Sequence, residues 1–433
     1  MHITSPLLAL LVTACTPTKA VVRTTTITGP TGDPAPAAGE TGEESQDEEQ
    51  SGPEPEPEEE EDPPADRALW TILVYLNGDN NLEENALIDM NEMEDVGSTD
   101  QVQLLVQLDR SSRYSREDGN WVGARRYRVE KDSNPYTITS PTLEVMGSVD
   151  SGLAETYVDF VRWGVQNFPA DRYALVIWDH GWGWDMAPGA ARKGVSEDEQ
   201  TGNWLSIAGG DLERLLADTT DITGTKLSLL GMDACLMGNW ETASVAAPYA
   251  EVYVASQATE SVDGWAYHTA YADLVADPEM DGQELGTVFA QRFIETRDAT
   301  QSVVDLRDLA PLNAAIDALA LEVLDQDNPR DAIIDAAREA QTFDGDVPDR
   351  DLGDLSLLLM EDSGSADIAD AAAVAFDEVQ DVVIANYTYG SWVRNATGLS
   401  IYLPTRHAPD PQYRDTSWAG LTHWDEMLDE ISR

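Results

Sequence analysis

The chain has 433 residues and a formal net charge of −55, from 81 acidic and 26 basic side chains. Such a charge repels nucleic acid and anionic lipid headgroups, so we expect no nucleic-acid partner. It attracts cationic ligands and divalent ions, although solubility or adaptation to salt would explain the same excess. Net charge therefore does not identify a substrate.

The N-terminal sequence "MHITSPLLALLVTAC" is typical of a secretory signal over residues 1–15, because its apolar run of about twelve residues is too short to span a bilayer. Its last four residues, Val12 to Cys15, resemble the bacterial lipobox, in which the cysteine is lipidated. The segment before the apolar run has no Lys or Arg, so a chance cysteine is the alternative. We expect an exported protein of the cell envelope that is attached to the membrane only through lipid on Cys15. Thr16, in place of Asp, favours an outer membrane where the cell has one.

Residues 16–66 are predicted to be a disordered acidic tether rich in Pro and Glu. From Thr24 to Asp66 there are fifteen acidic residues and no basic one, and almost nothing to bury. Repulsion between the carboxylates keeps such a segment extended. We interpret it as a spacer; a docking tail is the alternative.

The remaining segment, residues 67–433, is predicted to be an α/β fold. Short apolar runs predict buried strands, and apolar residues at helical spacing between them predict helices. The strands are expected at 70–76, 102–109, 173–179, 227–234 and 251–258, the helices at 82–93, 151–167, 209–218 and 240–248, a hairpin at 111–147 and a polar insertion at 185–205. Strands that are buried on both faces and alternate with helices indicate a mostly parallel sheet covered by helices on both faces.

The C-terminal third is predicted to be a mainly helical extension of the same domain, because no linker interrupts it. Its helices are expected at 282–297, 308–325, 329–341 and 366–385, and its strands at 302–306 and 397–404.

Two reactive side chains stand at predicted strand ends, where open parallel sheets bind ligands. His180 closes "YALVIWDH" and Cys235 closes "LSLLGMDAC". One βα unit with an insertion separates them, so their strands can be neighbours. A thiolate is a nucleophile for acyl transfer and an imidazole can take the thiol proton, which predicts a His–Cys dyad. The alternatives are a buried inert thiol and a structural histidine.

Gly181 and Asp233 complete the predicted site. Gly181 lets the backbone approach a substrate, and its N–H, with that of Cys235, is placed to receive an oxyanion. Asp233 points to the same side of the strand end as Cys235. A carboxylate there raises the pKa of the thiol, which is unfavourable for a nucleophile. Recognition of a cationic Arg or Lys side chain would explain why an aspartate stands at this position. An aspartate that only orders the turn is the alternative. HxxxH and CxxC spacings are absent from the sequence, which argues against zinc.

Five segments in order resemble the clostripain family of cysteine peptidases: "WTILVYLNGDNNLE", "YALVIWDHGWGW", "LLGMDACLMGNWETA", "VASQATESVDGWAYHTAYADL" and "TGLSIYLP". The resemblance implies a caspase-like α/β/α sandwich and cleavage after Arg or Lys. It matches His180 to the general base, Cys235 to the nucleophile and Asp233 to the acidic residue of the S1 pocket. The caspase signature Q-A-C-x-G is absent.

The resemblance also implies maturation by cleavage between the histidine and the cysteine. Arg192 and Lys193, in the polar insertion, are the candidate self-cleavage sites. The chemistry requires no cofactor; some family members need calcium, for which the sequence names no ligands.

The leading hypothesis is a lipid-anchored, monomeric cysteine endopeptidase that acts on peptides or proteins containing Arg or Lys. The runner-up is a peptidase-like surface lipoprotein that binds ligands without catalysis. A third hypothesis keeps the dyad for another acyl substrate.

Overall fold

A computed structural model describes residues 67–184, 194–295, 299–344 and 347–433 of the chain. The predicted signal, Cys15, the tether, Arg192 and Lys193 lie outside these described residues. The predicted boundaries at residues 15 and 66 therefore stay predictions.

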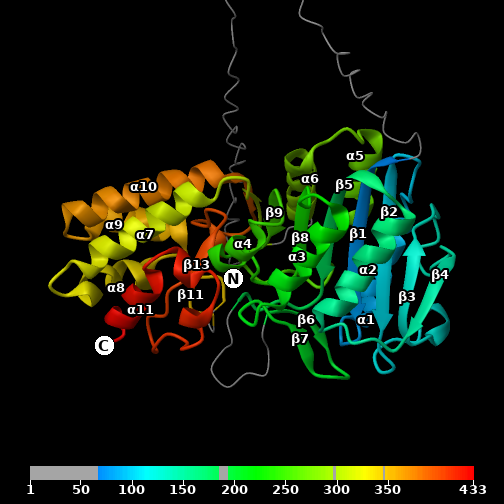
Figure 1. Ribbon diagram of the computed structural model, residues 1–433, viewed down its shortest axis with the longest axis horizontal. Coiled ribbons are helices and arrows are strands. Elements are labelled where there is room, and N and C mark those ends of the chain that lie inside the picture. The colour runs from blue at the N-terminus through cyan, green and yellow to red at the C-terminus, as the bar shows by residue number, and fades with distance from the viewer. Residues whose placement is uncertain (1–66, 185–193, 296–298, 345–346) are drawn as a thin grey trace, which may run out of the picture. The chain divides into compact units, whose positions relative to one another are not determined.

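The centre of the fold is a nine-stranded sheet in the order β12-β10-β9-β8-β5-β1-β2-β3-β4 (Figure 1). The five central strands, β9 to β2, are mutually parallel, and antiparallel strands extend the sheet at both edges. The strands are β1 Ala68–Gly78, β2 Val102–Arg110, β3 Gly123–Arg128, β4 Thr142–Gly147, β5 Ala170–Trp178, β8 Leu229–Asp233, β9 Val252–Ala255, β10 Thr300–Asp305 and β12 Val383–Thr388. The predicted mostly parallel sheet is confirmed, and the predicted hairpin supplies β3 and β4.

Helices cover both faces of this sheet, as predicted. They are α1 Glu83–Glu94, α2 Ala154–Asn167, α3 Asp211–Thr223, α4 Trp240–Ala246, α5 Tyr267–Ala276, α6 Gly282–Glu295, α7 Ala310–Leu324, α8 Pro329–Glu339, α9 Leu352–Asp362, α10 Ala366–Val382 and α11 Trp424–Ile431. Successive side chains of a strand point to opposite faces, so β1 sends Leu73 into one apolar cluster and Ile72 into the other. The first cluster includes α2, α3 and α4, and the second includes α1, α5 and α6.

The C-terminal third contributes both strands and helices. Its strands β10 and β12 join the main sheet, while α7 to α11 gather beside it, at the left of Figure 1. A two-stranded sheet pairs β11 (Asp349–Asp351) with β13 (Ser400–Tyr402). The helix predicted over 366–385 was too long, because the chain turns into β12 after Val382. Helices α5, α9 and α11 were not predicted.

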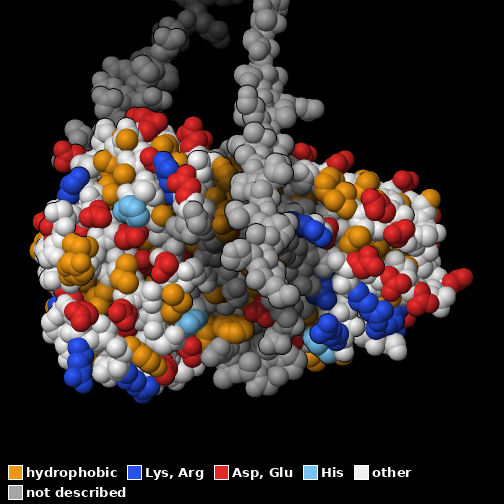
Figure 2. All heavy atoms as spheres, turned by 180° about the vertical axis from the view of Figure 1, so that it is seen from behind, with side chains coloured by type: hydrophobic (Ala, Val, Ile, Leu, Met, Phe, Trp, Pro, Cys, Tyr) orange, Lys and Arg blue, Asp and Glu red, His pale blue; other side chains and the backbone are white. Residues whose placement is uncertain are grey.

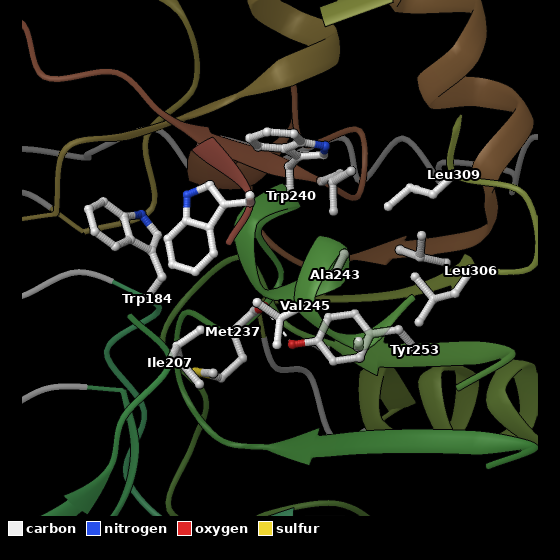
Figure 3. Packing of buried hydrophobic residues seen from close by; sticks show 14 of the residues in the cluster. Trp184, Ile207, Met237, Trp240, Ala243, Val245, Tyr253, Leu306 and Leu309 are labelled. Atoms are coloured by element: carbon white, nitrogen blue, oxygen red, sulfur yellow. Dashed lines mark hydrogen bonds between the residues drawn. The ribbon is translucent and has the colours of Figure 1, made fainter. Parts of the chain in front are cut away.

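The first apolar cluster joins this helical region to the sheet. Figure 3 shows Met237, Trp240 and Tyr253 within it, and the Tyr253 hydroxyl donates to the Met237 carbonyl at 2.8 Å. The loop that follows Cys235 is therefore anchored to β9. No helix of the described residues is long and apolar enough to cross a membrane.

Candidate active site

The register of the sheet brings His180 and Cys235 to the same edge. Strands β5 and β8 are parallel neighbours, with Trp178 opposite Asp233 as their last pair. His180 and Cys235 each follow two residues after that pair. The expectation that these strands lie side by side is confirmed.

A cavity of about 60 Å³ opens at this edge, between the ends of β5 and β8 and the loop that follows β9. It is lined by Leu82, Trp178, Asp179, His180, Asp233, Ala234, Cys235, Glu260, Ser261, Val262 and Gly264. The structure therefore gathers His180, Cys235 and Asp233, three residues singled out from the sequence, around one cavity.

Cys235 is half-buried, and the backbone of the 256–260 loop contacts its sulfur. The Glu260 N–H donates to Sγ at 3.2 Å, and Sγ lies 3.8 Å from the Glu260 carbonyl oxygen. The next residue, Leu236, has φ = 64°, which is costly for a residue with a branched side chain. Its N–H donates to the Ala258 carbonyl at 3.0 Å, which holds the turn in place.

Asn81 orients the His180 ring. Its Oδ1 lies 2.9 Å from His180 Nε2. Because an amide oxygen only accepts hydrogen bonds, this contact places the ring proton on Nε2 and makes Nδ1 the basic nitrogen. Asn81 belongs to the loop after β1, the neighbour of β5 in the sheet.

The residue before the histidine, Asp179, ties three loops together. Its carboxylate accepts from Asn77 Nδ2 and Asn80 Nδ2, both at 2.8 Å, and from the Glu197 N–H at 2.6 Å. Burial raises the pKa of Asp179 well above its usual range, and these hydrogen bonds lower it in part. The network fixes the backbone on which His180 stands.

Gly181 packs against the Cys235 backbone. A Cβ at Gly181 would lie 2.3 Å from the Cys235 carbonyl oxygen and 3.1 Å from its nitrogen. The glycine is therefore required for contact between the two loops, a different reason for its small size from the predicted approach of the backbone to a substrate.

Asp233 is buried, and its Oδ2 accepts from the Tyr267 hydroxyl at 2.7 Å and from the Trp265 N–H at 3.1 Å. Burial raises the pKa of Asp233 to about 6, and these hydrogen bonds lower it in part. Asp233 thus orders the loop before α5 and also lines the cavity.

Comparison with known proteins agrees with this geometry. The model of the clostripain family matches residues 74–430. The chain belongs to the clostripain family of cysteine peptidases. Clostripain of Hathewaya histolytica is 24% identical and the match covers 82% of this chain and 78% of that protein.

Two solved structures share the fold of this clostripain-family chain. A secreted C11 cysteine protease from Bacteroides thetaiotaomicron, bound to an irreversible peptide inhibitor, superposes with a TM-score of 0.63 at 20% identity. An inactive zymogen C11 protease from Parabacteroides distasonis superposes with a TM-score of 0.62 at 19% identity. These matches cover 83% and 82% of this chain, and 100% and 98% of those chains.

In this clostripain-family chain the loop tryptophans serve mainly for packing. Trp184 is buried against Tyr402, Tyr413 and Trp418, and Trp265 is buried against Phe289. Both side chains therefore pack against the fold, and neither lines the cavity.

The segment after the candidate self-cleavage sites is paired with the histidine loop. Gly194 accepts a hydrogen bond from the Trp182 N–H at 3.0 Å, and the Ser196 N–H donates to the His180 carbonyl at 3.0 Å. This segment continues into a hairpin of β6 (Val195–Asp198) and β7 (Asn203–Leu205).

Among the described residues, three buried aspartates form the group that fits a metal ion best. Asp79, Asp109 and Asp198 each offer a carboxylate oxygen, and these oxygens lie within 4.8 Å of one another. Burial raises the pKa of Asp79 to about 6 and of Asp109 to about 8; the charge of Asp198 adds to both shifts, and that of Asp79 adds to the shift of Asp109. Asp79 Oδ1 has no hydrogen-bond partner among the described residues. All-oxygen, anionic donors of this kind suit calcium.

Sequence reasoning missed Asn81, Asp179 and Glu260. Asn81 was detectable, because "NGDNN" follows a predicted strand and therefore lies at the edge where the site was expected. Glu260 was not detectable, because its contact with Cys235 uses a backbone N–H, which any residue carries.

Proposed function

We propose that the protein is an exported cysteine endopeptidase that cleaves peptide bonds after Arg or Lys. The observation that carries the proposal is the shared cavity of His180, Cys235 and Asp233. A nucleophile, a base and an anionic pocket at one strand edge suit acyl transfer on a peptide with a basic side chain.

In the proposed mechanism, His180 Nδ1 takes the proton of the Cys235 thiol and Sγ attacks the carbonyl carbon of the substrate. The resulting oxyanion is assigned to the N–H groups of Gly181 and Cys235, whose backbones touch. The imidazolium then protonates the leaving amine, which departs and leaves a thioester on Cys235. Water, deprotonated by His180, hydrolyses the thioester and restores the thiol.

Two groups support ionisation of Cys235 next to acidic residues. The Glu260 N–H donates to the sulfur, and a protonated His180 would stabilise the thiolate electrostatically. Both offset the negative charge of Asp233, which opposes ionisation of the thiol.

Asp233 is proposed to bind the cationic side chain at P1. It is buried at the cavity wall, and a carboxylate there without a Lys or Arg partner among the described residues favours a substrate that brings a positive charge. Similarity to clostripain, at 24% identity, supports the same specificity.

Self-cleavage after Arg192 or Lys193 is proposed as the activating step. Gly194, the first described residue after these sites, is paired with Trp182, two residues after His180. The cut bond would therefore adjoin a segment in contact with the histidine loop. An uncut surface loop is the alternative.

Lipidation of Cys15 and attachment to the cell envelope are also proposed. They rest on the lipobox-like sequence Val12–Cys15 and on the acidic tether that follows it. A Cys15→Ser variant that still fractionates with membranes would contradict this part of the proposal.

Calcium is proposed to bind the carboxylates of Asp79, Asp109 and Asp198. When bound it would neutralise three mutually repelling groups. Glu199 and Gln200, from the β6–β7 hairpin, hydrogen-bond to Asp79, so neutralisation there would stabilise the contact between this hairpin and the loop that carries Asn81.

The experiment for the peptidase uses the purified chain, with and without calcium, on fluorogenic peptides that carry Arg, Lys, Asp or Leu at P1. We expect cleavage after Arg and Lys only, and none from Cys235→Ala. Asp233→Asn should lower kcat/KM for Arg peptides on the order of a hundredfold, because it removes one partner of a buried charge pair. Cleavage after Leu or Asp would contradict the role of Asp233.

If the folded chain, with its 185–205 loop cut and calcium present, cleaves none of these peptides, the surface-binding lipoprotein becomes the better hypothesis. Rapid labelling of Cys235 by iodoacetamide without peptide cleavage would favour another acyl substrate.

A further inference from the structure

A second buried carboxylate, Asp89, stands behind the cavity that contains Asp233. It lies on α1 and is 1% exposed. Its Oδ2 accepts from the Trp178 indole N–H at 2.6 Å. Its Oδ1 has no hydrogen-bond partner among the described residues.

Asp89 and Asp233 are separated by one residue without a side chain. A Cβ at Gly264 would lie 2.7 Å from Asp89 Oδ2 and 3.4 Å from Asp233 Oδ2. Gly264 and Trp178 both line the cavity. The two carboxylates therefore lie close to the same lining residue, Gly264, with Asp233 at the cavity and Asp89 behind it, although they come from distant parts of the chain.

The surroundings of this pair are acidic. Glu92, on the same helix, and Asp263, in the loop before α5, add negative charge around Asp89, and Glu260 lies close to Asp233. His268 is bound to Glu92, with Nδ1 3.0 Å from Oε2. Among the ion pairs of the described residues, none joins a Lys or Arg to Asp89 or Asp233. The described residues thus contain two buried carboxyl groups near Gly264, and neither is paired with a Lys or Arg.

We propose that Asp89 is a second specificity-determining residue, which makes the selection of a cationic P1 side chain depend on a pair of carboxylates. This inference rests on the proposed Arg/Lys peptidase activity. Asp89 acts through Asp233 and the indole of Trp178, and no direct contact with substrate is required. A neutral side chain would leave both carboxylates uncompensated, so the pair disfavours neutral residues as well as attracting cations.

The pair also couples binding to protons. Burial, followed by the charge of Asp233, raises the pKa of Asp89 well above its usual range. Burial and the closeness of the two carboxylates favour a proton on the pair, and a P1 cation displaces that proton. Binding of cations should weaken as pH falls, and more steeply than for a single carboxylate.

Asp89→Asn tests the inference, because the amide oxygen of Asn can still accept from the Trp178 indole. The readouts are kcat and KM between pH 5 and 9 for two peptides, with Arg or its neutral isostere citrulline at P1. We expect KM for the Arg peptide to rise about tenfold at pH 7.5 with kcat changed less than about threefold, which lowers the Arg/citrulline ratio correspondingly. At acidic pH, the plot of log(1/KM) for the Arg peptide against pH should have a smaller slope in Asp89→Asn than in the wild-type protein.

Asp95→Asn is the matched control, since this exposed residue at the end of α1 loses the same charge far from the cavity wall. It should leave the Arg/citrulline ratio unchanged. The inference is overturned if Asp89→Asn keeps the wild-type ratio, or lowers kcat/KM for both peptides equally, as a purely structural role would.

Direct binding separates this inference from the proposed peptidase activity. Titration calorimetry of agmatine, an arginine-like cation, onto Cys235→Ala and onto Cys235→Ala/Asp89→Asn needs no catalysis. Weaker binding with less proton release in the double variant supports the pair even when no peptide is cleaved. Equal binding, or none to either protein, rejects it.

Discussion

At the scale of single residues, the hydrogen bond from His180 Nε2 to Asn81 leaves Nδ1 as the ring nitrogen that takes the proton in the proposed mechanism. Asn81→Ala removes the acceptor, so the ring can rotate or change tautomer. We expect kcat/KM to fall about tenfold, since a hydrogen bond to a group that becomes charged contributes about 1.5 kcal/mol or more.

The measurement is the pH dependence of kcat/KM for an Arg peptide. Asn81→Ala should also lower the apparent pKa of the base, because the imidazolium loses an acceptor. Asn81→Asp keeps an acceptor oxygen and should restore most of the activity. An unchanged profile in Asn81→Ala would exclude this role for Asn81.

The position of candidate site residues was predictable from the sequence where a rare side chain follows the end of a strand. Cys235 and His180 met that condition, and the structure places both at one cavity together with Asp233. Asp89 did not, because it lies within an ordinary helical pattern and reaches Asp233 only through the sheet and the 261–264 loop. Contacts of this kind depend on tertiary packing, which spacing does not encode.

At the scale of elements, the loops after β5 and β8 touch through Gly181. Gly181→Ala would place a methyl group 2.3 Å from the Cys235 carbonyl oxygen, so one of the loops must move. We expect a loss of activity of more than about tenfold, because a displacement of about 1 Å at a catalytic group is costly.

Gly420→Ala is the control for this change, because a Cβ there has open space within 4 Å and no unusual φ. Thermal unfolding and peptide cleavage should be measured for both variants. Full activity in Gly181→Ala would show that the loops adapt without cost.

Elements were predictable where their apolar pattern was long or continuous. The central strands are buried on both faces and are largely apolar, and the helices that follow them appeared where expected. The boundary between α10 and β12 was not predictable, because "DVVIAN" suits a helix end and an edge strand equally well. Pairing with β10 decides it.

At the scale of the whole molecule, the acidic side chains differ in burial, and those on the face drawn in Figure 2 are dispersed. Figure 2 shows carboxylates scattered over the described face, with Lys and Arg between them. The acidic residues whose pKa values change most are buried. Burial raises the pKa of Asp79 to about 6 and of Asp109 to about 8, and Glu241 and Asp349 shift in the same direction.

These shifts predict a stability that falls as pH rises. A raised pKa means that the folded chain binds the proton more tightly than the unfolded chain, so the stabilisation is complete below about pH 4 and is lost as pH rises towards 8. Each such group lowers the free energy of unfolding by about 1.4 kcal/mol per pH unit between its unfolded and folded pKa values.

Urea unfolding between pH 5 and 9, without calcium, measures this pH dependence of stability. The free energy of unfolding should fall over that range, and Asp109→Asn should flatten the curve. Stability that rises with pH over the same range would contradict the assignment.

Calcium should restore the stability that is lost as pH rises, because it binds the ionised carboxylates. We expect 5 mM calcium to raise the unfolding temperature at pH 8 and to have little effect on Asp109→Asn. Equal shifts in both proteins would place the ion elsewhere, and no shift in either would reject calcium binding at these aspartates.

The pairing of β5 with β8 has a consequence for a chain cut within residues 185–193. His180 would belong to one polypeptide and Cys235 to the other, with the central sheet built from both. The two fragments would stay together under native conditions and separate only in denaturant. Active enzyme should then be recoverable by mixing separately produced, individually inactive halves, as in a split reporter.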